Sequence, residues 1–494
     1  MSVAPAMLDR LGELCATLAQ GSPEHAPRLR QLAATLDEPL SIAIVGAVNA
    51  GKSTLVNALV NRKVAATDRG ECTRLVTRYR FGEIELARAI LDDGTALQLP
   101  YDPESLFPEK LGVPYERVKL IDVTLSIGAL KRVTIVDTPG INSTDEAKVL
   151  QTLDFMQARQ ADGVLFVSPG VAMDRDREFL RQYRLASGGP AAAPTNAVGV
   201  LSCADRLAPR SGEDPWPAAQ ALAAANAREL GSDIATVIPV IGQLAETANA
   251  GLFGQEDERS LHLLAALPAE VRRQMLSRGP AFLAADCDVA LPVRTSLLRR
   301  LGLYGLSVLL EAAAEGAPAT VMRQKLIECS GLDRLEEQIR RRFENRRAVL
   351  RAARSLTELR SLAVSLSASS RNLLLDELEA LEDDPLMHGL EELRALGSLE
   401  SQELILTADQ RTAGLRLLTE TEPLRRLRSP NADPETLVRL AGEAADYWTS
   451  VSSGCTHQQR TYRTTRALAR SAQLLSERLT AHDTGCESLR GVTK

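Results

Sequence analysis

An eight-residue segment has the residue types and spacing that bind a phosphate group. Its sequence, GAVNAGKS over residues 46–53, fits the pattern G-x-x-x-x-G-K-S. The glycines allow a tight turn, so that successive backbone N–H groups point at phosphate oxygens. We expect Lys52 to reach the outer phosphates and Ser53 to bind Mg²⁺ through its hydroxyl. The predicted cradle consists of Gly46, Asn49, Ala50, Gly51, Lys52, Ser53 and Thr54.

A second segment carries groups that can sense the terminal phosphate. Asp137-Thr138-Pro139-Gly140 follows a short apolar run, about 85 residues after Lys52. At a strand end beside the phosphate loop, Asp137 can hold Mg²⁺ through a water, and Gly140 can offer its N–H to the γ-phosphate. The alternative is a plain turn rich in Asp, Pro and Gly. The position at a strand end favours the functional interpretation.

A third group is expected in the polar loop at residues 67–73, where a Thr can close over Mg²⁺ and the γ-phosphate. Thr73, within Cys72-Thr73-Arg74, is preferred because a strand-like stretch follows it, and Thr67 competes for the role.

The residue that orients the attacking water is not the usual glutamine. Ile141 and Asn142 follow Gly140, which excludes hydrolysis that depends on a glutamine at this point. Asn49 lies two residues before Gly51, where it can face the oxygen that bridges the β- and γ-phosphates.

We expect the segment Ser202-Cys203-Ala204-Asp205, which follows an apolar run, to recognise the nucleotide base. An Asp here accepts hydrogen bonds from guanine N1–H and the 2-amino group, which adenine cannot supply. The usual pattern is N/T-K-x-D, and Cys203 replaces its Lys. This departure weakens the guanine assignment or predicts weak affinity. Arg206 can supply a cation from the next position, and the alternative role of Asp205 is to cap the following helix.

The elements that must position these groups follow an α/β pattern. Helical stretches separate most of the strand-like runs, which predicts a mostly parallel sheet, and Asp92-Asp93-Gly94 predicts a hairpin. The strand-like runs lie at residues 40–45, 84–91, 96–99, 118–125, 133–136, 164–167, 198–201 and 237–240.

Helical patterns dominate the remainder of the chain. Residues 2–20 and 29–36 predict two amphipathic helices before the sheet, and strand patterns end after about residue 250. Residues 332–384 contain neither Gly nor Pro, enough for a helix on the order of 75 Å long. Because that exceeds a globular core, it predicts an antiparallel bundle or stalk. Arginines at positions 460, 463, 466 and 470 favour a solvated helix face.

Composition excludes several classes of protein. The net charge of −6 argues against a nucleic-acid binder. Seven scattered cysteines without a CxxC pair argue against a zinc site or disulfide framework and fit a reducing cytoplasm. Charged residues interrupt the first apolar stretch, so we expect no signal peptide. No apolar run reaches about eighteen residues, so any membrane contact is expected to be peripheral.

Together these motifs resemble those of the bacterial dynamin-like proteins. More narrowly, the chain is similar to the actinobacterial isoniazid-inducible (IniC) type and the related sporulation-septum dynamins of Streptomyces. The resemblance is specific over the first 250 residues and looser in the helical part. It rests on residues 46–59, 72–74, 137–140 and 205, and on later stretches at 291–294, 301–306, 329–332 and 384–386.

The resemblance implies an α/β P-loop GTPase head joined to an all-α helical bundle of neck and trunk. The implied division is residues 1–39 for N-terminal helices that join the neck, 40–285 for the head and 286–494 for neck and trunk. It also implies hydrolysis of GTP to GDP with Mg²⁺, modest affinity, no separate exchange factor and a head-to-head dimer that assists hydrolysis. The implied catalytic residues are Asn49, Lys52, Thr73 and Gly140, with Ser53, Thr73 and Asp137 at the metal and Asp205 and Arg206 at the nucleotide.

The resulting interpretation is a cytoplasmic GTPase that rearranges its trunk in membrane remodelling, at the inner face of the cell membrane or the division septum. The alternative is a nucleotide-binding scaffold that pairs with a second dynamin-like protein and hydrolyses little. Cys203 and a degenerate fifth nucleotide motif at Val240-Ile241-Gly242 favour the alternative. A candidate lipid-binding tip lies near residues 383–400, with leucines at 386, 390, 393 and 396 and a methionine at 387, but its acidic residues favour internal packing of these side chains.

Overall fold

The computed structural model describes residues 3–65, 75–100, 111–140, 161–187, 197–210, 212–231, 233–382, 388–400 and 404–490. Among these residues, nine strands form a single sheet in the order β4-β3-β5-β2-β6-β1-β7-β8-β9. The strands are β1 (Leu40–Gly46), β2 (Thr77–Phe81), β3 (Leu86–Leu91), β4 (Ala96–Leu99), β5 (Val118–Leu125), β6 (Val133–Asp137), β7 (Gly163–Ser168), β8 (Ala197–Leu201) and β9 (Val237–Pro239).

The sheet has a parallel half and a mixed half. Strands β6, β1, β7, β8 and β9 run parallel to one another. On the other side, β2 is antiparallel to β6, and β3 pairs in antiparallel fashion with β4 and β5, which includes the predicted hairpin. The carboxyl ends of the parallel strands therefore meet at one edge of the sheet. The prediction of an α/β head with a mostly parallel sheet is confirmed.

Helices cover both faces of the sheet. The apolar side chains of β1 alternate between the two faces, so each face has its own buried core. Ile42 and Ile44 belong to a core shared with α3 (Lys52–Val60) and α13 (Leu332–Arg342). Ala43 and Val45 belong to the opposite core, which contains residues of α5 (Asp174–Ser187) and α6 (Trp216–Leu230). A further helix, α7 (Gly242–Asn249), packs on α3.

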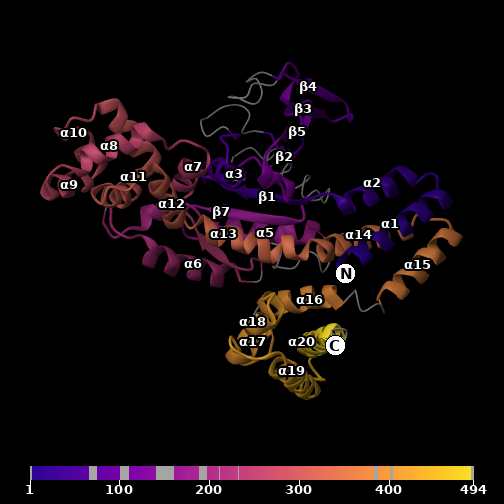
Figure 1. Ribbon diagram of the computed structural model, residues 1–494. Helices are drawn as coiled ribbons and strands as arrows, with labels where there is room; N and C mark the ends of the chain where they lie inside the picture. The colour runs from indigo at the N-terminus through magenta and orange to yellow at the C-terminus, as the bar shows by residue number, and fades with distance from the viewer. Residues whose placement is uncertain are drawn as a thin grey trace.

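A side bundle of helices projects from the edge of the sheet domain near α7 (Figure 1). Its core is formed largely by α11 and its neighbours. The bundle consists of α8 (Gln255–Ala265), α9 (Ala269–Leu276), α10 (Gly279–Ala284), α11 (Leu291–Ala314) and α12 (Ala319–Ser330).

The prediction of an antiparallel bundle over residues 332–384 is confirmed, because the structure divides this stretch into three helices. These are α13, α14 (Arg347–Ala363) and α15 (Ala368–Glu382). The first break follows Phe343, whose ring lies where a side chain on Gly163 would stand, 2.6 Å from the position of a Cβ. The second break reverses the chain, so that α15 packs back against α14 and an antiparallel bundle results.

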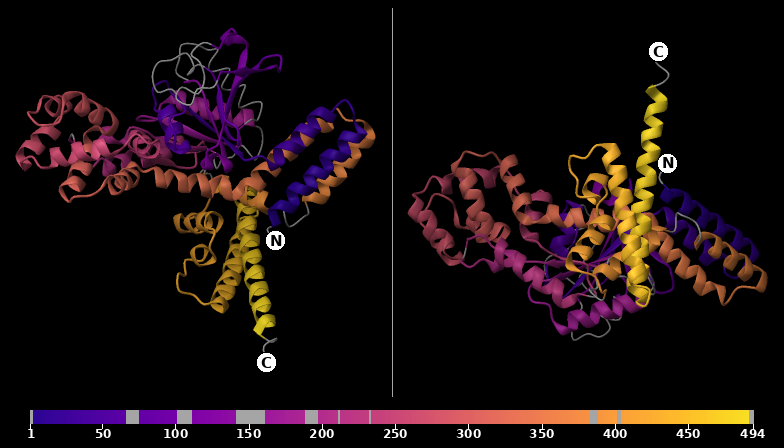
Figure 2. Two further views of the ribbon diagram at one scale, coloured as in Figure 1. Left: turned by 45° about the horizontal axis from the view of Figure 1, so that its top comes forward. Right: turned by 90° about the horizontal axis from the view of Figure 1, so that it is seen from below.

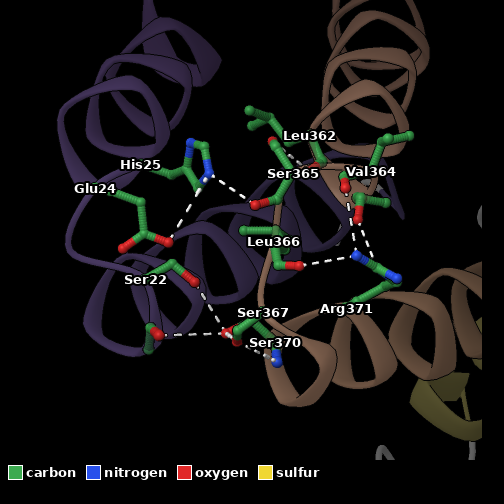
Figure 3. Close-up of polar contacts among 12 residues, drawn as sticks. Ser22, Glu24, His25, Leu362, Val364, Ser365, Leu366, Ser367, Ser370 and Arg371 are labelled. Atoms are coloured by element: carbon green, nitrogen blue, oxygen red, sulfur yellow. Dashed lines mark hydrogen bonds and ion pairs between the residues drawn. The ribbon is translucent and has the colours of Figure 1, made fainter.

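A neck bundle forms from α14 and α15 with the two N-terminal helices, α1 (Val3–Gly21) and α2 (Ala26–Asp37). Figure 3 shows how its tip is fastened. Ser22 Oγ donates to Ser370 Oγ at 2.9 Å, and Nε2 of His25 lies 3.2 Å from the carbonyl oxygen of Ser365. Arg371 donates to the carbonyl groups that end α14. The N-terminal hairpin and the α14–α15 turn are therefore one rigid end.

A C-terminal bundle completes the molecule (Figure 2). In the candidate tip region, Leu393 and Leu396 are buried, in agreement with internal packing, whereas residues 383–387 lie outside the described residues. Of the four arginines predicted on a solvated face, Arg460, Arg463 and Arg466 are exposed and Arg470 is half-buried. No helix within the described ranges is long and apolar enough to cross a membrane. The helices are α16 (His388–Glu400), α17 (Ala408–Thr419), α18 (Pro423–Arg426), α19 (Pro434–Gly454) and α20 (Gln459–Arg490).

Candidate nucleotide-binding site

The loop between β1 and α3 has a backbone that depends on glycine. Gly46 has φ 153°, and a Cβ there would lie 2.1 Å from the carbonyl oxygen of Val167 on β7. Asn49 and Gly51 also have positive φ values of 60° and 88°, which Gly adopts freely and Asn tolerates. The loop therefore turns tightly at the carboxyl edge of the sheet, and α3 begins directly after it.

Lys52 folds back over this loop. Its Nζ donates to the carbonyl oxygens of Gly46 at 3.1 Å and Ala47 at 2.8 Å, and its side chain is buried. Burial lowers the pKa of Lys52, and the nearby Asp137 carboxylate opposes that shift. The ammonium group is thus held by carbonyl oxygens at the mouth of the helix, where the helix N-terminus also favours an anion.

Asp137 ends β6 and faces Ser53. Ser53 Oγ donates to Asp137 Oδ2 at 3.3 Å. Oδ1 of Asp137 is buried and accepts no hydrogen bond from any residue that the structure describes. Burial raises the pKa of Asp137 to about 6, although the charge of Lys52 opposes the rise. A buried carboxylate oxygen without a donor, beside a hydroxyl, suits the outer ligand shell of a hard cation such as Mg²⁺.

Gly140 lies against the phosphate loop. A Cβ on Gly140 would stand 2.4 Å from Cγ2 of Val48 and 2.8 Å from its backbone nitrogen. Thr138 fixes the approach, because its Oγ1 donates to the carbonyl oxygen of Ile44 on β1 at 2.8 Å. The segment after β6 can reach the cradle this closely only because residue 140 has no side chain.

The predicted base-reading segment follows β8 and touches the cradle from the other side. Ser202 Oγ donates to the carbonyl oxygen of Ala50 at 2.6 Å. Asp205 lies in the short helix η6 (Ala204–Leu207), and burial raises the pKa of its carboxyl group. Cys203 is in the left-handed region with φ 54°, and Arg206 is exposed. Asp205 is thus placed by a segment fastened to the phosphate loop.

The structure brings most of the predicted residues to the same edge of the sheet. Thr54 also contacts the fifth-motif segment, since a Cβ on Gly242 would lie 3.6 Å from its Cγ2. The two candidate threonines, Thr67 and Thr73, lie outside the described residues, as do Ile141 and Asn142.

Sequence reasoning missed two polar residues that shape the site. Besides Ser202, the fully buried Asn57 of α3 accepts from the backbone N–H groups of Val64 and Ala65 and donates to Glu246 Oε1 at 2.6 Å. In the sequence, both residues are polar side chains in an apolar setting. Asn57 lies within the apolar helix α3, and Ser202 is the first residue after the buried strand β8.

The chain is similar in sequence to one family of proteins and to two individual relatives. A family model described as the Dynamin family matches residues 42–190. The isoniazid-induced protein IniC of Mycobacterium tuberculosis is 30% identical over 487 residues, which cover 92% of this chain and 95% of that relative. Dynamin-like protein 2 of Campylobacter jejuni is 27% identical over 163 residues, which cover 32% of this chain and 26% of that protein.

Solved structures include similar chains at low identity. One belongs to an oligomerised bacterial dynamin pair, described as a mechanism for the long-range sensing and tethering of membranes. The two chains are 14% identical, and their alignment covers 98% of this chain and 78% of that one, with a TM-score of 0.35.

Proposed function

The chain belongs to the dynamin family, as a bacterial dynamin-like GTPase of the IniC type, and from that premise we propose that it hydrolyses GTP and uses hydrolysis to rearrange its helical trunk. The observation that carries this proposal is the pair of charges at the cradle. Lys52 is held over the phosphate loop, and Asp137 presents a buried oxygen without a donor beside Ser53.

We assign roles to the residues at this edge. The backbone N–H groups of the loop and Lys52 bind the phosphates, and Asn49 faces the β–γ bridge. Gly140 contacts the γ-phosphate, Asp205 reads guanine, and Arg206 lies beside the base. Thr73 is retained as the proposed residue that closes over the γ-phosphate.

The residues present fit Mg²⁺. Ser53 would bind the ion directly, Asp137 would bind it through a water, and Thr73 would complete the protein ligands. When bound, the ion would offset charge on the phosphate oxygens. The chain's own part is to orient the phosphates with Lys52 and the loop N–H groups.

A head-to-head dimer, or a pair with a second dynamin-like protein, is supported by apolar side chains at the same edge. Val48, Val171 and Met173 are exposed by 52%, 65% and 52%. The loop that carries Val171 is held rigidly, because Asn226 accepts from Ala172 N and donates to the carbonyl of Gly170. Rigid, exposed apolar groups beside the cradle suit an interface that forms around the nucleotide.

We propose that the chain has three parts: N-terminal helices at residues 1–39, the head at residues 40–285, and the neck and trunk at residues 286–494. The packing of α13 into the core of the sheet favours a moving neck that begins near Phe343. The proposed place of action is the cytoplasmic face of the inner membrane, in division, septation or membrane stress.

A second candidate function is a nucleotide-binding scaffold that pairs with another dynamin-like protein. Cys203 favours it, since no long cationic stem is available to pack on a base from that position. Co-sedimentation with liposomes discriminates the two. Pelleting of the isolated protein supports the membrane remodeller, and its absence supports the scaffold.

Lys52→Ala tests the proposal directly. Because Lys52 carries the ammonium group of the cradle, we expect GTP turnover to fall by at least about 100-fold. Steady-state release of phosphate from GTP measures it. Turnover that persists in the variant at the wild-type rate would place hydrolysis elsewhere.

A further inference from the structure

Helix α11 is broken at its centre, beside the proposed base-reading residue. Gly302 has φ 62° and ψ −179°, which interrupts the helix. This combination of angles is open almost only to glycine. A Cβ built on Gly302 would lie 3.8 Å from Oδ2 of Asp205. A methyl group added at the break would therefore stand in van der Waals contact with the carboxylate.

Beyond the break, α11 holds the segment that follows Asp205 in the chain. Ser307 Oγ lies 3.0 Å from the carbonyl oxygen of Gly212 and 2.8 Å from that of Tyr304, and its hydrogen can be donated to either. Tyr304 Oη accepts a hydrogen bond from Nε1 of Trp216, the first residue of α6, at 3.2 Å. The loop between η6 and α6 is thus fastened to α11 at two points.

The same part of α11 packs closely on α7, which begins at the fifth nucleotide motif. A Cβ on Gly305 would lie 2.5 Å from Cδ2 of Leu244, so the two helices are in tight contact there. The carbonyl oxygen of Arg300 accepts from Thr247 Oγ1 at 2.9 Å. The middle of α11 therefore contacts the loop after η6 and α7, and it shares a core with Ala204 and Leu207 of η6, the element that carries Asp205.

We propose that Gly302 is a specificity-determining residue, and that the break in α11 forms a wall of the base site. The break keeps the space beside Asp205 open for the N1–H and 2-amino groups of a guanine ring. An alanine at position 302 strains the left-handed backbone. The two halves of α11 would then change their relative orientation, and the wall at position 302 would move towards Asp205. This inference rests on the proposed reading of guanine by Asp205.

The contribution of Asp205 can be measured apart from that of the phosphate cradle. GDP and IDP carry the same diphosphate, but hypoxanthine lacks the 2-amino group and so loses one hydrogen bond to the carboxylate. A hydrogen bond to a charged group corresponds to about 10- to 150-fold in affinity. The ratio of the two dissociation constants therefore reports the geometry at Asp205.

The test compares GDP, IDP and inorganic pyrophosphate binding to the full-length protein by isothermal titration calorimetry. We expect the wild type to prefer GDP over IDP by about 10-fold or more. Gly302→Ala should lower that preference by at least about fivefold. Its affinity for pyrophosphate should stay within about twofold of the wild-type value, because the phosphate loop is untouched.

Gly316→Ala is the matched control. Gly316 follows the end of the same helix with φ 76°, and a Cβ there would meet nothing within 4 Å. This variant also places a side chain at a positive φ, fourteen residues further along the chain, and should keep the wild-type preference. If Gly302→Ala does not fold, Ser307→Ala replaces it, with an expected loss of preference of at least about twofold.

Three results overturn the inference. The first is an unchanged GDP preference in Gly302→Ala, or in Ser307→Ala where that variant replaces it, which leaves the proposed GTPase intact. The second is an equal loss of preference in Gly316→Ala, since remote strain would then explain the effect. The third is a wild type that binds GDP and IDP equally, which contradicts the reading of guanine by Asp205 as well.

Discussion

At the residue scale, the cradle combines one buried cation with one buried carboxylate. Lys52 is satisfied by carbonyl oxygens, whereas Asp137 has only the hydroxyl of Ser53 at one oxygen and no donor at the other among the described residues. Burial raises the pKa of Asp137 to about 6. A buried carboxylate with an unpaired oxygen is costly to keep ionised. A divalent cation beside it would remove that cost, which is the physical reason for the proposed Mg²⁺.

Gly140→Ala tests the contact between the two phosphate-facing segments. The added methyl group would overlap Val48, since its position is 2.4 Å from Cγ2 and 2.8 Å from the backbone nitrogen. One of the segments must move, and a shift of about 1 Å at a catalytic group can cost about 100-fold in rate. We expect the turnover number for GTP to fall by about 10- to 100-fold, with a smaller loss of GDP affinity.

The control for this variant is Gly128→Ala, in the short helix η3 (Gly128–Lys131), where a Cβ would meet nothing within 4 Å. It should turn over GTP at the wild-type rate. A Gly140→Ala protein with full turnover would show that residue 140 can accept a side chain during hydrolysis, contrary to its proposed role.

Local motifs carry most of what the sequence predicts about the site. The phosphate loop, Asp137 and Asp205 lie at or after the carboxyl ends of β1, β6 and β8, which run parallel in one sheet, with β7 between β1 and β8. Their roles stay predictions. Ser202 and Gly302 could not be predicted, because each acts through residues about 100 or more positions away in the chain, Ala50 for the first and Asp205 for the second.

At the element scale, the joint between the sheet and α14 is built from buried charges. Asp162, just before β7, lies 3.0 Å from Nη2 of Arg351 and 3.3 Å from Nη1 of Arg354, and it accepts from the backbone N–H of Ser41 at 2.8 Å. Arg351 also donates to the carbonyl oxygen of Pro39 at 2.7 Å. Strands β1 and β7 lead from this joint to the nucleotide edge, so α14 is fastened to the two strands that carry the cradle.

Asp162→Asn should weaken this joint strongly. The amide keeps the shape of the carboxylate but removes the ion-pair partner of Arg351, whereas Arg354 keeps Glu358 at 3.4 Å. Asp162 and Arg351 have side chains exposed by only 2% and 3%. Breaking a buried ion pair in this way costs about 3–5 kcal/mol. We expect a lower urea midpoint for unfolding, followed by circular dichroism.

Asp93→Asn serves as the comparison, because Asp93 pairs with Arg117 on the surface, where both side chains are about half exposed. Its urea midpoint should match that of the wild type, since exposed pairs contribute little. Equal midpoints for Asp162→Asn and the wild type would mean that the buried charges do not hold the joint.

Two elements show where periodicity in the sequence is insufficient. Strand β2 lies in the strand-like stretch expected after Thr73, but the charges of Arg78 and Arg80 obscure where it begins and ends. Both arginines pair with the buried Asp122 on β5. The helical pattern over residues 332–384 continues across two breaks. The first depends on the fit of Phe343 against Gly163 and the second on capping by Arg371. Such contacts are tertiary and leave no local pattern.

At the scale of the whole molecule, one chain of helices connects the base side of the site to the neck. Helix α11 packs on η6, which carries Asp205, and leads through α12 and α13, which lies along the sheet, to α14 at the charged joint (Figures 1 and 2). The neck bundle also includes α1 and α2, which lead back into β1 and the phosphate loop. Two continuous stretches of the chain therefore connect the nucleotide edge to the neck, one through α11 to α14 and the other through β1.

The measurement that tests the central claim most directly is GTP turnover as a function of protein concentration, with Mg²⁺ present and Lys52→Ala as the background. If the head is a GTPase assisted by head-to-head contact, the wild type releases phosphate above that background, and its activity per molecule rises with concentration towards a plateau. A wild type that releases no more phosphate than Lys52→Ala at any concentration would contradict the proposal.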